Sequence, residues 1–559
     1  MKRVLGGAIA ALFLGLSFSN PLAAAAADPA VDKTYVEGTD PQAFLFNPLK
    51  VNRVDITMTP AAEAALRQDP RVYQPATIKL TTELGATNVY NVGLHIKGGW
   101  GSYRSLDDKT GFKVKVDFSV KGQTIYSVKK FTLNNMVQDS SMLHEATSYR
   151  LFRAMGVPAP RVGYANVFFN GLSYGLHSNI ETYDKPMLSR WFPGGTAHLL
   201  EGAYGVEVGP DMQVDEGSAT DLRDVTELRD LNALSGQEWF DKIRARVDLN
   251  EMIMSWAVSH YIDHWDGYTR GWPNNYYVHK EKGGLWTMLP WGTDQTWVSW
   301  NDFIDDGATM MTRCVNYSPC RELYETALAQ IQAKVPTLSL PNMVDRIWEK
   351  ILPSVTADSR KPYSTSDAVS AKDATKSVMI ARIQELVSRN GNRRASSISA
   401  SYSIIHAAVQ ATIKPKLTFT GDGLLTFKRL EGFDVCEVNP ETGAVLVLNS
   451  GLCLVGIQLA QTDNYHSAMV TLKLSIPKLA SRIQLPTIAP LRAGRTVQLN
   501  PQTDSSGALK LKIKSGRCRV TGKTVKALSG SGKCLVTVSV AGDENYLAAA
   551  KVVSIRLRF

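Results

Sequence analysis

Apolar and polar residues alternate regularly through the first part of the chain. Residues 50–57, KVNRVDIT, alternate as a strand does, and a proline soon after opens a short helical stretch. The segments TIKLTTE, VYNVGLHIKGGW and GFKVKVDFS are rich in β-branched and aromatic residues and are separated by turn residues. The dipeptide Asn170-Gly171 between two apolar runs is a strong hairpin signal. The pattern predicts a sheet-rich lobe over about residues 50–182.

From about residue 183 the apolar residues recur at helical spacing. Asp248 is a good N-cap and Glu251 completes a capping box, so a helix should begin at Leu249. The later stretches LYETALAQIQAKV and SVMIARIQELVSRN are amphipathic. We therefore expect a helical lobe over about residues 183–400.

Near residue 400 the pattern changes again, to short strands and turns that repeat. Two units align, and the interval from the second cysteine to a tyrosine is twelve residues in both. The matching positions are Cys436, Cys453, Asn464, Tyr465 and Ala468 in the first unit, and Cys518, Cys534, Asn545, Tyr546 and Ala549 in the second. The repeat predicts two small β-sandwiches, residues 401–476 and 477–559, each with its own disulfide.

The predicted fold class is thus α+β, with two lobes followed by two small all-β modules. Residues 1–27 combine Lys2 and Arg3 with an apolar run and an alanine-rich end, which predicts a secretory signal peptide and a mature domain over 28–400. No later stretch is apolar for long enough to span a bilayer, so we expect a secreted or surface protein without a membrane span in the mature chain.

Cysteine spacing and net charge refine this picture. The six cysteines suit an exported protein, and their local spacing predicts three neighbouring disulfide pairs. The net charge of +10 is modest for a chain of 559 residues, and we expect no nucleic-acid partner.

Candidate chemistry gathers where a predicted hairpin connects two polar loops. Asp266 follows the helix that begins at Leu249, Asn274 and Asn275 precede the first strand, and Asp294 follows the second. The hairpin should bring the two aspartates together. Carboxylate and carboxamide oxygens are the ligands that Mg²⁺ takes while it keeps water and phosphate oxygens. The arrangement indicates phosphoryl transfer, although aspartates in loops are also commonly just solvated.

Basic residues in the sheet-rich lobe suit the same chemistry. Lys97, Gly98 and Gly99 lie in a turn where glycines let the backbone approach a ligand. Lys113 and Lys115 share one face of the following strand and either hold phosphates or lie solvated at a sheet edge.

The order Asp, Asn, hairpin, PWxxD resembles the CotH (spore-coat protein H) kinase family of secreted or surface kinases with a distant protein-kinase-like fold. The segment FTLNNMVQDSSMLHEATSYRLFRAMGVPAP and the turn KGGWGS, where Lys97 stands in place of an arginine, carry the same resemblance over about residues 50–400. The β repeats resemble bacterial immunoglobulin-like repeats, which act as spacers or bind cell-surface or polysaccharide partners.

The resemblance implies an ATP- and Mg²⁺-dependent kinase with assigned roles for individual residues. Asp266 would orient the acceptor hydroxyl, Asp294 with Asn275 or Asn274 would hold Mg²⁺, and Lys113 or Lys115 would hold phosphates. Glu145 would pair with a phosphate-binding lysine, and Glu181 and Thr182 would form the hinge that contacts the adenine edge. Trp286 or Trp291 would flank the adenine ring.

One residue departs from the family pattern. Many members read WDxD, whereas this chain has Gly292 at the first acidic position. Two functions therefore stay open: a secreted kinase that phosphorylates serine or threonine of exported proteins, and a catalytically inactive kinase-like surface protein that binds through its β repeats.

Overall fold

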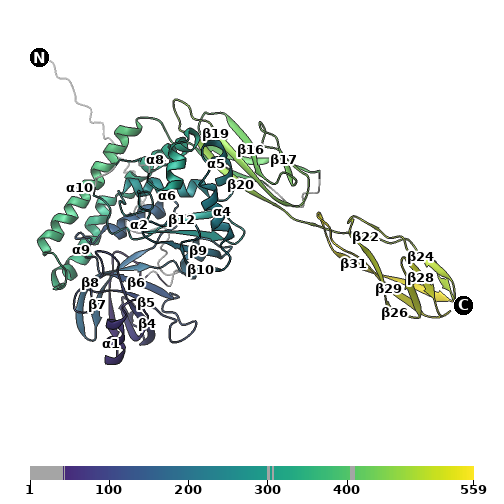
Figure 1. Ribbon diagram of the computed structural model, residues 1–559, viewed down its shortest axis with the longest axis horizontal. Helices are drawn as coiled ribbons and strands as arrows, with labels where there is room; N and C mark the ends of the chain where they lie inside the picture. The colour runs from purple at the N-terminus through teal and green to yellow at the C-terminus, as the bar shows by residue number, and fades with distance from the viewer. Residues whose placement is uncertain (1–41, 43, 299–301, 305–306, 403–409) are drawn as a thin grey trace, which may run out of the picture.

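The computed structural model describes residues 42, 44–298, 302–304, 307–402 and 410–559. The predicted signal peptide, residues 1–27, lies outside the described residues. Figure 1 shows a sheet lobe and a helical lobe packed together, from which two strand-built modules extend in a row toward the C-terminus. The predicted α+β region followed by small all-β modules is confirmed.

The N-terminal lobe is built around an eight-stranded sheet in the order β1-β7-β8-β6-β5-β4-β2-β3. Because β1 pairs with β7 on one side and with β2 on the other, the sheet closes on itself. Val54, Ile56 and Phe112 fill the interior. Helix α1 (Pro60–Gln68) covers one end of β2. The strands are β1 (Val51–Thr57), β2 (Gln74–Thr82), β3 (Gly85–Ala86), β4 (Tyr90–Lys97), β5 (Gly111–Lys115), β6 (Lys130–Asn134), β7 (Val162–Phe169) and β8 (Leu172–Glu181).

The second lobe combines helices with a four-stranded sheet in the order β10-β9-β11-β12. Its strands are β9 (Thr196–Gly202), β10 (Gln213–Glu216), β11 (Tyr276–Glu281) and β12 (Trp286–Pro290). The helices from α2 onward are α2 (His144–Ala154), α3 (Lys185–Trp191), α4 (Arg223–Leu231), α5 (Gly236–Ile243), α6 (Leu249–Tyr261), α7 (Thr309–Val315), α8 (Ser318–Leu338), α9 (Leu340–Ala357) and α10 (Thr365–Asn390).

Helix α6 begins at the predicted residue, but its capping box is incomplete. The Asp248 carboxylate accepts a hydrogen bond from the Glu251 backbone N–H at 3.1 Å, as an N-cap should. The Glu251 carboxylate instead accepts from the backbone N–H of Met288 in β12 at 2.9 Å. The glutamate therefore ties the start of α6 to the hairpin, a long-range contact that the local pattern did not predict.

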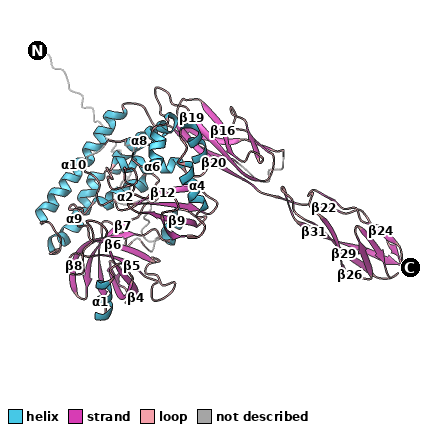
Figure 2. Cartoon of the chain, in the orientation of Figure 1, coloured by secondary structure: helices cyan, strands magenta, loops and turns pink. Residues whose placement is uncertain are grey.

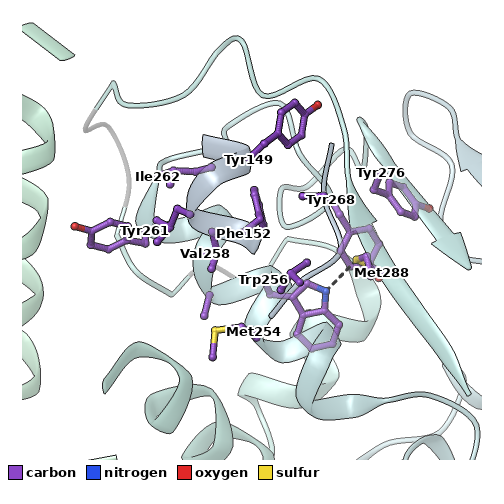
Figure 3. Close-up of a cluster of buried hydrophobic side chains, with 14 of the residues drawn as sticks. Tyr149, Phe152, Met254, Trp256, Val258, Tyr261, Ile262, Tyr268, Tyr276 and Met288 are labelled. Carbon is purple, nitrogen blue, oxygen red and sulfur yellow. Dashed lines mark hydrogen bonds between the residues drawn. The ribbon is translucent and has the colours of Figure 1, made fainter. Parts of the chain in front are cut away.

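One continuous core joins α2, α6 and the β11–β12 hairpin. Figure 3 shows Phe152 of α2 close to the side chains of α6, and Trp256 of α6 directed at Met288 of β12. The Trp256 indole N–H lies 3.2 Å from the Met288 sulfur. Both loops at the ends of the hairpin are consequently carried by tightly packed elements.

A buried ion pair holds the two lobes together. Lys109 of the sheet lobe and Asp358 at the end of α9 lie 2.5 Å apart, and their side chains are 1% and 0% exposed. Asp358 also accepts from the backbone N–H of Leu176 at 3.1 Å. Burial lowers the pKa of Lys109, and the Asp358 charge opposes that shift.

The first β module packs against the helical lobe. Arg246 pairs with Glu431 at 2.8 Å and Lys428 with Asp241 at 2.6 Å. The module consists of β13 (Ser397–Tyr402), β14 (Thr412–Ile413), β15 (Pro415–Thr420), β16 (Leu425–Glu431), β17 (Cys436–Val438), β18 (Val445–Val447), β19 (Gly451–Leu459) and β20 (Ala468–Ile476).

The second β module contacts the first through a short junction, where Ser450 donates to Asn545 at 2.7 Å. In Figure 2 both modules are drawn as strands and loops. The second contains β21 (Leu479–Ala480), β22 (Ile483–Gln484), β23 (Leu491–Arg492), β24 (Thr496–Gln498), β25 (Gln502–Thr503), β26 (Leu509–Ser515), β27 (Cys518–Thr521), β28 (Thr524–Ala527), β29 (Lys533–Val540), β30 (Tyr546–Leu547) and β31 (Ala549–Arg558).

The three predicted neighbouring disulfides are confirmed. They join Cys314 to Cys320, Cys436 to Cys453, and Cys518 to Cys534. Disulfides are typical of proteins in oxidising compartments. Among the described residues, no helix combines the length and the apolar character needed to cross a membrane.

Candidate functional site

A cleft of about 940 Å³ collects most of the predicted site residues. Its walls come from the β4–β5 connection of the sheet lobe and from the loops that flank the β11–β12 hairpin. The predicted residues that line it are Lys97, Gly98, Gly99, Lys113, Asp266, Asn274, Asn275, Trp291 and Asp294.

The hairpin brings the two aspartate loops together as the sequence pattern predicts. Tyr276 pairs with Pro290 in the β11–β12 register, and the Trp291 N–H donates to the Asn275 carbonyl at 3.0 Å. Asp266 and Asp294 consequently line the same cleft.

Two carboxamides hold the Asp266 carboxylate. One carboxylate oxygen accepts from Asn274 Nδ2 at 3.0 Å, and the other accepts from Asn275 Nδ2 at 2.8 Å. Asn275 Nδ2 also lies 2.9 Å from the Asp266 carbonyl, and Asn275 has a left-handed φ of 47°. A carboxylate accepts about four hydrogen bonds, so Asp266 keeps free lone pairs for a further donor.

Asp294 is nearly buried and sits beside a second carboxylate. Its side chain is 7% exposed, and its backbone carbonyl accepts from a ring nitrogen of His144 at 2.9 Å. Asn134 Nδ2 donates to Glu145 at 2.8 Å and lies 3.5 Å from Asp294. The two acidic groups therefore share one amide donor.

Electrostatics at this corner of the cleft favour a bound cation. Burial and then the charge of Asp294 raise the pKa of Glu145 above its usual range, while Lys97 acts in the opposite direction. Glu145 also accepts from Ser178 at 2.8 Å. The negative charges outnumber the nearby positive charge, so a cation would relieve their repulsion.

The donor set fits Mg²⁺ that keeps part of its water and phosphate shell. The described part of the chain contains no cluster of three or more histidine, cysteine, aspartate or glutamate side chains that could enclose a metal. Asp294, with carboxamide oxygens of Asn275 or Asn274, offers the few hard oxygen ligands that Mg²⁺ takes from proteins at phosphate sites.

The opposite wall of the cleft is basic and close to the backbone. Lys97 ends β4, and Lys113 projects from β5 opposite His95. Gly98 has a φ of 123°, and a Cβ there would meet the Tyr103 backbone at 2.8 Å. The turn therefore requires glycine, and it presents a backbone surface beside two lysines.

Five of the predicted residues do not line the cleft: Glu145, Lys115, Glu181, Thr182 and Trp286. Lys115 points toward the ring of Tyr73, with its Nζ 5.9 Å from the ring centroid. Trp286 is 1% exposed in the core and stacks on His198, so its ring is not positioned to flank a ligand in the cleft. Trp291 is the tryptophan of that pair that lines the cleft.

Glu181 and Thr182 lie at the end of β8, beyond the cleft-lining residues. The Glu181 carboxylate pairs with Arg161 at 2.9 Å and with Arg190 at 2.6 Å. Burial alone would raise the pKa of Glu181, but the two arginines outweigh it and the pKa is lowered. The Thr182 carbonyl accepts from the Asp184 N–H at 2.7 Å. The Glu181 side chain is therefore committed to an ion-pair network.

Several cleft residues were not predicted as site residues. Glu201 of the cleft lining lies on β9 without a distinctive motif. Asn134 does not line the cleft but donates to Glu145, and it lies in the quoted NN dipeptide, which carried a usable signal. The remaining lining residues are Arg71, His95, Trp100, Gly101, Ser102, Gln138, Tyr204, Trp265, Gly292 and Gln295.

The departure at Gly292 has a structural counterpart. A Cβ at Gly292 would meet Asn275 Oδ1 at 2.5 Å, and the residue has a left-handed φ of 55°. The Asn275 carboxamide thus occupies the space next to the position where a side chain would begin. An aspartate at 292 would displace Asn275 from Asp266.

A closed sheet lobe with lysines and a glycine turn, set over a helical lobe with paired aspartates, defines a two-lobed kinase-like protein. Residues 94–394 match the family model described as CotH kinase protein. The chain belongs to the CotH kinase family, which confirms the resemblance seen in the sequence and implies a kinase that uses ATP. No curated protein matches the sequence at a significant level.

Solved structures are similar to parts of the chain at low identity. One comprises the titin domains Z1Z2 in complex with telethonin, with 10% identity over 30% of this chain and 98% of that chain, and a TM-score of 0.19. Extracellular domains 3–5 of Drosophila OTK match with 14% identity over 27% of this chain and 56% of that chain, and with a TM-score of 0.18. Fibronectin(III)-like modules of Clostridium thermocellum CbhA match with 11% identity over 29% of this chain and 94% of that chain, and with a TM-score of 0.13. TM-scores this low do not define an architecture, so the fold of the β modules follows from their own strand pairing.

Proposed function

We propose that the protein is an exported Mg²⁺-dependent kinase that transfers the γ-phosphoryl group of ATP to serine or threonine hydroxyls of exported proteins. The observation that carries this proposal is the convergence of Asp266, Asn275, Asp294, Lys97 and Lys113 on one cleft, although they come from both lobes. Such chemistry depends mostly on positioning and on neutralising charge.

Asp266 is the proposed base for the acceptor hydroxyl. The new bond joins the acceptor oxygen to the γ-phosphorus, the bond from that phosphorus to the β–γ bridging oxygen breaks, and the hydroxyl proton moves to the Asp266 carboxylate. Hydrogen bonds from Asn274 and Asn275 fix the carboxylate for this transfer.

Asp294 and Asn275 are the proposed holders of Mg²⁺, which neutralises phosphate charge when bound. Lys97, which lies within electrostatic range of Glu145, takes the role of the glutamate-paired lysine. Lys113 faces the same cleft and would contact phosphate, whereas Lys115 points elsewhere.

The test uses the disulfide-bonded mature chain, residues 28–559, with γ-labelled ATP, Mg²⁺ and a mixture of exported proteins. Asp266→Asn should lower the rate of transfer by about 10²- to 10⁴-fold with little change in the KM for ATP. Asp294→Asn should lower the rate comparably and weaken Mn²⁺ binding measured by calorimetry in the presence of ATP.

Asp302→Asn is the matched control, because Asp302 is exposed and outside the cleft lining. It should leave both rate and Mn²⁺ binding unchanged. Label transfer that survives Asp294→Asn, or mass spectrometry that locates the label on residues other than serine and threonine, would contradict the assignment.

The second candidate function is a kinase-like surface protein without turnover, and Gly292 is the observation that favours it. The loss of one acidic residue lowers the charge available to a metal. In that case the wild-type chain would bind ATP and Mn²⁺ but transfer no label to any protein.

A further inference from the structure

Positive charge is concentrated in the second β module. Residues 477–559 contain fifteen lysines and arginines and only three aspartates and glutamates, a net charge of +12, which exceeds the +10 of the whole chain. Residues 401–476 contain five basic and six acidic residues, a net charge of −1. Two modules with the same interval from the second cysteine to the tyrosine therefore differ greatly in charge.

The basic residues occupy both sheets of the module. On the four-stranded sheet β23-β31-β29-β26, Lys533 lies directly opposite Arg556, and Arg492 lies directly opposite Arg558. On the three-stranded sheet β24-β28-β27, Arg519 lies opposite Lys526. All six of these residues are exposed.

These like-charge pairs act against the stability of the module. Equal charges directly opposite each other on neighbouring strands are destabilising. Lysines on an edge strand such as β26 can be explained as protection against edge-to-edge association, but Lys533 and Arg556 lie on β29 and β31, the two central strands of the sheet. Edge protection therefore does not account for them.

The fold itself does not need these charges, as the first module demonstrates. Aligned on the second cysteine of each unit, the counterparts of Lys533 and Arg556 are Leu452 and Ser475, which pair in the same way on β19 and β20. Glu437 stands where the second module has Arg519, directly after the first cysteine. The equivalent sheet thus forms with neutral or acidic residues.

The acidic residues of the second module do not offset the basic ones. Asp504, Asp543 and Glu544 lie in loops, and the Asp543 carboxylate accepts hydrogen bonds from the backbone N–H groups of Ser506 and Tyr546. No ion pair joins two residues within 477–559, a range that the structure describes throughout. The cations are free to meet an external polyanion.

We propose that the second β module binds a linear anionic polysaccharide through cations on both of its sheets. A flat membrane could contact only one sheet at a time, whereas a flexible polymer can contact both. The module contains only two aromatic residues, Tyr546 and Phe559, so it lacks the rows of rings on which nucleic-acid bases stack. In Figure 1 the module extends away from the sheet lobe and the helical lobe, whose residues line the cleft, so it can hold a surface polymer without covering the cleft.

The test measures binding of the full mature chain to polygalacturonate, with dextran, duplex DNA and anionic phospholipid vesicles as the other probes. The wild-type chain should bind polygalacturonate in a salt-dependent manner, more tightly than DNA or vesicles, and should not bind dextran. The charge-removed variant carries Lys533→Leu, Arg556→Ser, Arg519→Glu and Lys526→Leu. These changes copy the first module, in which Leu446 pairs with Glu437 as Lys526 pairs with Arg519. It should bind at least about tenfold more weakly, with a shallower dependence on salt.

The matched control removes the same kind of charge from the first module, by Lys416→Ser and Lys473→Leu, both at exposed positions. It should bind polygalacturonate like the wild type. Circular dichroism should show that both variants keep their β modules folded. Unchanged binding by the folded charge-removed variant would overturn the proposal, as would a wild-type chain that prefers DNA or vesicles, or that binds none of the polymers.

Discussion

The cleft and the second β module both gather charge, but in opposite ways. The cleft contains a few groups of both signs, partly or fully buried, which come from β4, β5 and the loops around the hairpin. The module contains many exposed groups of one sign that lie close together in the sequence. A site made of few placed charges depends on each of them, whereas a surface made of many equal charges depends on their sum.

The largest expected contrast concerns a buried and an exposed lysine. Lys109→Met leaves the Asp358 carboxylate buried without its partner, so the free energy of unfolding should fall by about 3–5 kcal/mol. Lys512→Met in the module removes an exposed charge and should change it by less than about 0.5 kcal/mol. Chemical denaturation measures the change in the free energy of unfolding for each variant. Similar changes in the two variants would contradict the expected difference between the buried and the exposed lysine.

Acid should destabilise the kinase domain and spare the second module. Burial, followed by the charge of Lys109, lowers the pKa of His177 to about 4. The pKa of His177 in the folded state lies below the value of about 6.5 in the unfolded chain, so the unfolded chain binds a proton at a higher pH than the folded chain does. The free energy of unfolding of the kinase domain is therefore largest above pH 6.5 and decreases as the pH falls toward 4.

At pH 5 the loss from His177 amounts to about 2 kcal/mol. Residues 477–559 contain no histidine, so the unfolding of that module should hardly change between pH 7 and pH 5. Calorimetry at the two pH values tests this, and His177→Gln should reduce the pH dependence of the kinase domain. Equal acid sensitivity of both regions would contradict the prediction.

The smallest expected effect compares two glycines with nearly the same left-handed φ. Gly292 in the cleft has a φ of 55° and Gly522 in the module a φ of 56°, but only at Gly292 would a Cβ meet a neighbour, Asn275. Gly292→Ala should shift Asn275 away from Asp266 and lower the rate of label transfer by about tenfold, or about 1.4 kcal/mol.

Gly522→Ala carries a similar backbone strain without the collision and should leave the transfer rate unchanged. If the loss at Gly292 acts through Asn275, the double variant Gly292→Ala with Asn275→Ala should be no slower than Asn275→Ala alone. Additive losses would show that the methyl group acts on another part of the cleft.

Several features could be predicted from the sequence because they depend on local order. The spacing of the cysteines indicated the neighbouring disulfides, the Asp248 side chain marked the start of α6, and the β11–β12 hairpin followed from alternating residues around a glycine turn. The excess of lysine and arginine in the second module is also present in the sequence, but the modest net charge of the whole chain did not indicate it. Local spacing and composition determine these features before any long-range contact forms.

The tertiary structure decided which partners these residues meet. It directs Glu251 to the Met288 N–H instead of to its own helix, places Lys97 in electrostatic range of Glu145, and brings Trp291 rather than Trp286 to the cleft. These choices depend on packing between segments that are far apart in the sequence, and a local pattern carries no information about such distances. The sequence by itself therefore determined the candidate groups and the module charge, and only the fold determined how those groups meet in the cleft.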